Sequence, residues 1–131
     1  MPVHVTSQAL SQMRAAAANA HPQEACGILL GEGGWITQAH AAANVHPLPA
    51  THFEIDPQAL IDAHRAARGG GPQIVGYFHS HPAGPPAPSA TDRACAAGDG
   101  RVWAIIGGAA ICFWRDEPQG FAAISYTPSD P

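Results

Sequence analysis

Lysine is absent from the 131-residue sequence, and its six basic residues are arginines scattered along the chain. Proteins that bind nucleic acids carry basic side chains clustered on one face. Ten acidic residues bring the formal charge to −4. These features indicate that nucleic acid is not a partner of this protein.

The chain also lacks the apolar stretches that a membrane protein or an exported protein needs. No apolar run approaches the length of a membrane span, and the first residues, MPVHVTSQALSQ, do not combine a charged start with an apolar core. We therefore expect a cytoplasmic protein that does not associate with membranes.

Cysteine is scarce and widely spaced. Cys26, Cys95 and Cys112 form no C-x-x-C pair, which argues against a disulfide framework and against a thiolate zinc site. We expect small buried thiols, and the sequence leaves open whether Cys95 and Cys112 pair.

What the chain does contain is typical of a globular protein. Hydrophobic residues make up 46% of it and charged residues 12%, whereas disordered chains are rich in charge and poor in apolar side chains. A chain of this length fits one compact domain with one core. We expect a single domain over residues 1–131.

Apolar periodicity predicts that helices and strands alternate. Helices, each with a capping residue or a first-turn proline, are expected at 7–20, 57–68 and 89–97. Strands, rich in apolar residues, are expected at 3–6, 25–30, 35–44, 53–55, 73–79, 101–107, 111–116 and 121–126. This order predicts an α/β fold in which helices pack on a mixed sheet that closes in a hairpin.

Two histidines stand at the end of a predicted strand, in GYFHSHPAGPPAPSATD. His79 and His81 are two residues apart, so an extended backbone points their side chains to the same face. Catalytic zinc sites use three protein ligands and keep one position for water. Asp92, in the first turn of the helix that follows the proline-rich loop, is the candidate for the third ligand.

Each part of this pattern also has a simpler explanation when taken alone. A His-x-His pair is common by chance, and Ser89 with Asp92 forms a capping box that starts a helix. Their combination after a buried strand favours a metal site. A hydrolytic site also needs a base, and Glu24, directly before the apolar run ACGILL, is a candidate. By pattern alone, Glu24 is equally compatible with an exposed helix–strand junction.

The segments EACGILLG and HSHPAGPPAPSATD together resemble the signature of the JAMM (JAB1/MPN/Mov34) metallopeptidases, a separated Glu followed by H-x-H-P-x(6)-S-x-x-D. The likeness covers nearly the whole chain, since an N…FEIDP segment precedes a helix and a VWAII strand follows the aspartate. It is greatest for compact bacterial members, including those similar to sulfur-carrier-protein–cysteine hydrolases.

The resemblance implies a role for each motif residue. His79, His81 and Asp92 would bind Zn²⁺, Glu24 would be the general base and proton shuttle, and Ser89 would hydrogen-bond the oxyanion. It also implies a three-layer α/β/α sandwich with a curved mixed sheet, as in cytidine deaminases.

The activity that the resemblance implies is hydrolysis by a zinc-activated water. The bond would be the amide after the C-terminal Gly-Gly of a ubiquitin-like or sulfur-carrier protein. We expect a narrow groove that takes this extended tail by strand addition.

Three other interpretations are weaker. A RadC-like JAMM protein linked to DNA repair shares the H-x-H-P-x-G segment but not the EACGILLG start. A non-catalytic MPN binding scaffold would lack one or more metal ligands, whereas this chain has all of them. A cysteine hydrolase would use Cys26, but a thiol inside an apolar strand run is usually neutral and inert.

The sequence also gives expectations for residues outside the motif. Asn44 and the loop to Phe53 are expected to border the substrate groove, an expectation that rests on the order of segments in the family. The remaining histidines are expected on the surface or in loops, with His46 and His52 as the one pair of possible ligand spacing. The tryptophans are expected in the core: Trp35, Trp103 and Trp114.

Overall fold

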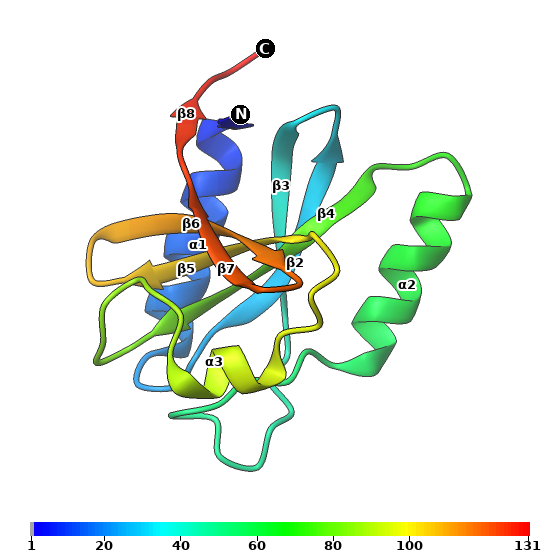
Figure 1. Ribbon diagram of the computed structural model, residues 1–131. Helices are drawn as coiled ribbons and strands as arrows, with labels where there is room; N and C mark the ends of the chain where they lie inside the picture. Colours follow the sequence, from blue (N-terminus) through cyan, green and yellow to red (C-terminus); the bar gives the residue numbers. More distant parts are fainter. Residues whose placement is uncertain (1) are drawn as a thin grey trace.

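The computed structural model describes residues 2–131, and eleven elements make up its fold (Figure 1). In chain order they are β1 (Val3–Val5), α1 (Ser7–Ala20), β2 (Cys26–Glu32), β3 (Trp35–Ala42), α2 (Pro57–Arg68), β4 (Gln73–His81), α3 (Ala90–Cys95), β5 (Val102–Gly107), β6 (Ala110–Glu117), β7 (Gly120–Ile124) and β8 (Tyr126–Pro128).

The two long helices begin where their caps predict. The Thr6 side chain accepts the N–H of Ala9 to start α1, and the Asp56 side chain accepts the N–H of Gln58 to start α2. The buried face of α1 carries residues at helical spacing: Ala9, Leu10, Met13 and Ala16.

The eight strands form one mixed sheet in the order β7-β6-β5-β4-β2-β3-β1-β8. β2 pairs antiparallel with both β3 and β4, and β5, β6 and β7 form an antiparallel run. β4 and β5 are parallel, and α3 lies in the connection between them. This connection positions the candidate site, because it starts where β4 ends.

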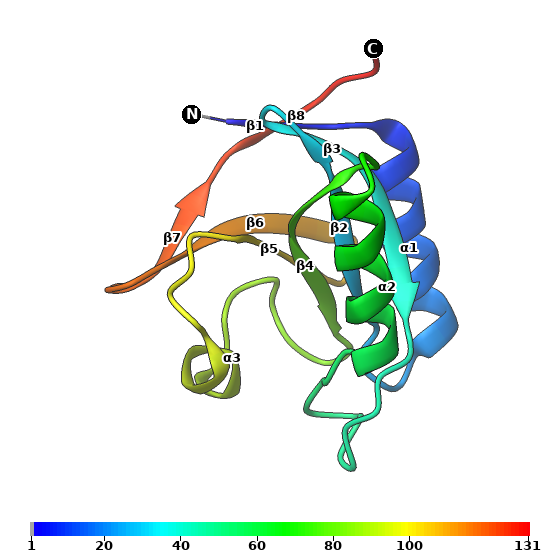
Figure 2. The ribbon, with the colours of Figure 1, turned by 90° about the vertical axis from the view of Figure 1, so that its right-hand side faces the viewer.

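The sheet curls until it is nearly barrel-shaped (Figures 1 and 2). β7 and β8 stand at opposite ends of the strand order, yet only Ser125 separates them in the chain. The prediction of one strand over 121–126 is wrong for this reason. The Ser125 carbonyl accepts the N–H of Val3, and the chain then leaves β6 to pair with β1.

The helices cover both faces of the sheet (Figure 2). Strand alternation sends Leu29 and Phe78 into the core beneath α1, and it sends Ile28 and Tyr77 toward the second cluster, beneath α2. β4 therefore has a core-facing side and a side that faces α2, and the two histidines lie on the second side.

Two further predicted features differ from the structure. The expected strand 53–55 is reduced to an isolated bridge between Asn44 and Ile55, because the Asn44 side chain forms hydrogen bonds with backbone groups of this loop. Of the expected buried thiols only Cys26 is buried; all three cysteines are free, with Cys95 exposed and Cys112 half-buried. Among residues 2–131, no helix has both the length and the apolar character needed to cross a membrane.

Candidate metal centre

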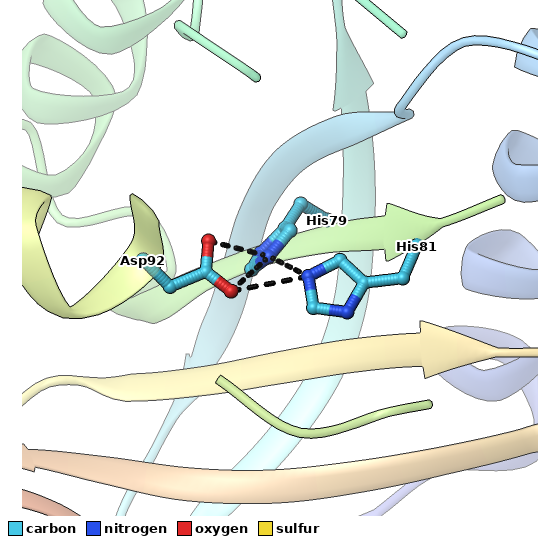
Figure 3. A group of neighbouring side chains, drawn as sticks. All are labelled: His79, His81 and Asp92. Carbon is cyan, nitrogen blue, oxygen red and sulfur yellow. Dashed lines mark hydrogen bonds and ion pairs between the residues drawn. The ribbon is translucent and has the colours of Figure 1, made fainter. Parts of the chain in front are cut away.

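His79 and His81 lie at the C-terminal end of β4, where their side chains project from the same face of the sheet. Nε2 of His79 lies 3.0 Å from Nε2 of His81, as Figure 3 shows. The Nδ1 atom of His81 is 2.8 Å from the Pro85 carbonyl oxygen, to which it donates its proton. In the neutral imidazole, this hydrogen bond leaves Nε2 of His81 without a proton, which is the form that can bind a metal ion.

Asp92 reaches the same point from α3. Its helix begins at Ser89, whose hydroxyl accepts the Asp92 N–H while the Asp92 carboxylate accepts the Ser89 N–H. Oδ2 of Asp92 lies 3.1 Å from Nε2 of each histidine (Figure 3). The capping box therefore turns the carboxylate toward the end of β4.

These three side chains fit a small divalent metal ion. Their candidate ligand atoms all lie within 4.8 Å of one another, and His79 and Asp92 are buried. Ligands of a tetrahedral zinc ion, with bonds of about 2.0–2.1 Å, are separated by about 3.3 Å. The observed separations of 3.0–3.1 Å are close to this value. Two imidazole nitrogens and one carboxylate oxygen are also the ligand types that zinc prefers.

The charges of the three residues suit cation binding as well. Burial lowers the pKa of His79 below its ordinary value. Burial acts to raise the pKa of Asp92, but the hydrogen bonds with His79 and His81 outweigh it and hold that pKa below its usual range. The hydrogen bond with Asp92 raises the pKa of His81. The site thus holds an ionised carboxylate beside a neutral, buried imidazole.

Glu24 is buried, with 7% of its surface exposed, two residues before β2 begins. Its N–H donates to the Pro49 carbonyl, and the next residue, Ala25, exchanges two hydrogen bonds with Ser80. Ser80 stands between the two histidines and points to the opposite face of β4, so these bonds fix Glu24 relative to the metal centre. Burial raises the pKa of Glu24 to about 7, while His81 lowers it. The alternative of an exposed junction residue is therefore wrong for Glu24.

The raised pKa of Glu24 predicts a pH-dependent stability of the metal-free protein. The folded state keeps the Glu24 proton up to about pH 7, whereas an unfolded chain releases it near the ordinary glutamate pKa of 4.5. The free energy of unfolding should therefore fall between these pH values. One pKa unit corresponds to about 1.4 kcal/mol. Between pH 5 and pH 8, we therefore expect the free energy of unfolding to decrease by about 1–3 kcal/mol more in the wild-type protein than in Glu24→Gln.

The measurement is urea unfolding of both chains in the presence of a chelator. Taking the difference between the two chains removes the part of the His79 and His81 titration that does not depend on Glu24. Parallel stability curves for wild type and Glu24→Gln across this pH range would contradict the prediction.

A cavity of about 360 Å³ opens beside Asp92. Phe53 stacks on the His79 ring with 4.3 Å between centroids, and Trp103 meets the same ring edge-on at 5.6 Å. Both residues line the cavity. Trp103 is buried as expected, but it borders the site rather than serving only the core. Trp35 and Trp114 are only partly buried, so the expectation of three core tryptophans is wrong for these two.

The loop before α2 borders the site as the family order suggested. Phe53 lines the cavity, but Asn44 does not; its amide instead donates to the carbonyls of Glu24 and His52 and holds the loop in shape. His46 and His52 stack with 4.6 Å between ring centroids and also line the cavity. Within residues 2–131 this pair belongs to no group of three potential metal ligands.

Cys26 does not have the properties of a nucleophile. Its thiol is buried and points to the Ala42 and Ala43 carbonyl oxygens, each 3.7 Å from the sulfur. Burial, with a smaller contribution from the nearby Glu24, raises the pKa of Cys26 to about 12. A thiolate is the reactive form of cysteine, so this environment opposes the cysteine-hydrolase interpretation.

Sequence comparison relates the chain to proteins that are named for their activities. The desampylase of Haloferax volcanii is 40% identical over 98 residues, which cover 73% of this chain and 70% of the relative. A probable TtuB-protein conjugate cleaving protease of Thermus thermophilus is 33% identical over 90 residues, which cover 69% of this chain and 60% of the relative.

Structure comparison gives similar folds over almost the full length. A protein from Desulfitobacterium hafniense superposes with a TM-score of 0.87 at 28% identity, covering 98% of this chain and 94% of the other. A JAB1/MPN domain protein from Archaeoglobus fulgidus superposes with a TM-score of 0.61 at 16% identity, covering 95% and 96%. The second likeness supports a JAB1/MPN type of fold.

The family comparison agrees with the motif. Residues 6–117 match the family of prokaryotic homologs of the JAB domain. This range contains the whole pattern of Glu24, the two histidines, Ser89 and Asp92, and it confirms the resemblance on which the residue roles were assigned. The protein therefore belongs to the prokaryotic JAB-domain family and is a compact member of the JAMM group.

Proposed function

We propose that the protein is a zinc-dependent hydrolase that cleaves the amide bond after the C-terminal Gly-Gly of a ubiquitin-like or sulfur-carrier protein. The observation that carries the proposal is the convergence of the His79, His81 and Asp92 ligand atoms within 4.8 Å. The names of the relatives, a desampylase and a probable conjugate cleaving protease, support a hydrolase that acts on protein conjugates.

In this proposal His79, His81 and Asp92 hold the zinc ion. A zinc ion bound there acts as a Lewis acid and lowers the pKa of water from 15.7 to about 7. Glu24 accepts the proton of the attacking water and returns it to the leaving amine. A group with this task works best when its pKa is near the operating pH, and the burial of Glu24 brings its pKa to about 7.

Ser89 is assigned the stabilisation of the oxyanion. Its hydroxyl oxygen accepts the Asp92 N–H, so the hydroxyl proton is free to be donated to another group. One preorganised donor of this kind typically contributes about 10²–10³ in rate. The capping and oxyanion roles of Ser89 are compatible because they use different atoms of the hydroxyl.

Two alternatives within the family are less well supported. A non-catalytic scaffold has no need for a complete ligand set or for a buried glutamate beside it. A RadC-like role in DNA repair is disfavoured by the six dispersed arginines and the formal charge of −4.

The proposal extends to the setting of the site. We assign residues 1–131 to one domain with a three-layer α/β/α, cytidine-deaminase-like arrangement, supported by α1 and α2 lying on opposite faces of the sheet. A cytoplasmic location belongs to the same proposal, since the conjugates of ubiquitin-like proteins are its expected substrates.

A panel of amide substrates tests the activity. One carrier protein ending in Gly-Gly is joined through an amide to a short lysine peptide, and a matched carrier ends in Ala-Ala. We expect cleavage after the second glycine and about 10–200-fold lower kcat/KM for Ala-Ala, because added methyl groups must enter a groove shaped for glycine. Mass spectrometry of the products locates the cut. Equal cleavage of both carriers, or cleavage only of unrelated peptides, would rule out this substrate class.

A further inference from the structure

The third candidate ligand lies on an element that has little apolar anchorage of its own. α3 is six residues long, and Asp92 is its only buried residue. A helix this short is not stable by itself, so other contacts must hold it. The question is what keeps the Asp92 carboxylate opposite the two histidines.

The contacts come from strand β6, on the far side of β5. Ile111 and Phe113 of β6 point into the core cluster beneath α1. Residues alternate between the faces of a strand, so Trp114 and Asp116 point to the opposite face, which carries the metal centre. Trp114 pairs directly with Trp103, the residue that meets the His79 ring.

Asp116 binds the segment that follows α3. Its side chain is 1% exposed, and both carboxylate oxygens accept backbone protons: Oδ2 from the Ala97 N–H at 3.0 Å and Oδ1 from the Gly98 N–H at 3.1 Å. Its own backbone accepts the Gly100 N–H at 2.7 Å and donates to the Arg101 carbonyl at 2.9 Å. A carboxylate with this arrangement holds the end of the connection firmly to β6.

Trp114 binds the segment that precedes α3. Its indole N–H donates to the Pro86 carbonyl at 3.2 Å, one residue after the carbonyl that receives the His81 proton. The loop also lies so close to β5 that a Cβ on Gly107 would be 2.5 Å from the nitrogen of Pro86. The contact with Trp114 therefore locates both the start of α3 and the acceptor that orients His81.

We propose that Trp114 and Asp116 are positioning residues of the metal centre, which grip the 82–101 connection on either side of α3 and so place Asp92 against His79 and His81. The inference rests on the proposed function only in taking this centre as a metal site. Neither residue touches the candidate ligand atoms, and both act through the backbone of the connection. Trp114 and Asp116 both belong to β6, so the strand holds their two contacts with the connection at a fixed separation.

Two variants of the full chain test the proposal: Asp116→Asn, which replaces one acceptor oxygen by an amide donor, and Trp114→Phe, which removes the indole N–H and keeps an aromatic ring. Zinc affinity is measured with Zn²⁺ alone, by competition against a chelating dye. We expect Asp116→Asn to weaken zinc binding about 10–100-fold, as loss of supporting hydrogen bonds does at other metal sites, and Trp114→Phe to weaken it less.

A second readout does not need the metal. Amide hydrogen exchange of the metal-free protein should become at least about 10-fold faster at Ala97, Gly98 and Arg93 in Asp116→Asn, while exchange in β2 and β4 keeps its wild-type rate. The matched control is Ile111→Val, a core substitution on the other face of β6 that lowers global stability. It should leave zinc affinity unchanged.

The outcomes separate this inference from the proposed function. Unchanged zinc affinity in both variants would overturn the positioning role, even if exchange becomes faster, and so would an equal loss of affinity in Ile111→Val. Failure of the wild-type protein to bind zinc would overturn the proposed function, and the exchange rates would then still decide whether β6 holds α3.

Discussion

His79→Ala is expected to remove zinc binding and to lower kcat by at least about 10³-fold. The substitution takes away the most buried of the three candidate ligands, and two remaining side chains are too few to hold a catalytic zinc ion. A bound metal ion contributes several kcal/mol of transition-state stabilisation, and each 1.36 kcal/mol is a factor of ten in rate. Elemental analysis of the purified protein and hydrolysis of the Gly-Gly amide give the two measurements.

Asp92→Asn separates loss of the ligand from loss of packing. The His79 ring stacks on Phe53 and meets Trp103 edge-on, so its removal also disturbs the cavity wall. Asparagine keeps the size of Asp92 but replaces an ionised oxygen that lies 3.1 Å from both histidines. It should lose zinc and turnover to a similar extent. His64→Ala, on the exposed side of α2, is the histidine control. Zinc-free His79→Ala protein that retains wild-type turnover would exclude the mechanism.

The ligand set could be predicted because each part of it depends on local geometry. Side-chain alternation places His79 and His81 on one face of any extended strand, and a capping box fixes the direction of Asp92 relative to Ser89. Only the approach of α3 to the end of β4 is long-range. The proline-rich loop signalled it, and the similarity to a known family supported it.

The surroundings of the site could not be predicted because they depend on contacts between distant segments. Glu24 was ambiguous in sequence, since the hydrogen bonds that fix its backbone come from the loop at Pro49 and, through Ala25, from Ser80 of another strand. Trp103 resembled a core residue because strand patterns do not tell which face of a sheet carries a cavity. The sequence shows Asp116 only as an acidic residue at the end of the predicted strand 111–116, and a charged residue near a hairpin is usually exposed, so its contact with the segment after α3 was not predicted.

The same limit explains the error at the C-terminal end of the sheet. Residues 121–126 have the composition of a single strand, and nothing local marks Ser125 as the point where pairing changes from β6 to β1. The curling of the sheet decides this point. It brings the two ends of the chain together without altering the face of β4 that carries the histidines, so the error in topology did not affect the prediction of the site.

Glu24→Gln is expected to keep the metal and to lose about 10²–10⁴-fold in kcat, the range that general acid–base catalysis contributes. Glutamine fills the same space and keeps the backbone bonds to Pro49 and Asn44, but it cannot take up and return a proton. Zinc content should remain at the wild-type level, in contrast to His79→Ala. Glu54→Gln provides the control, since Glu54 is exposed and also lines the cavity beside Asp92. If Glu24→Gln turned over at the rate of Glu54→Gln, the proton would have to move through another group, and the assignment of Glu24 as the base would be wrong.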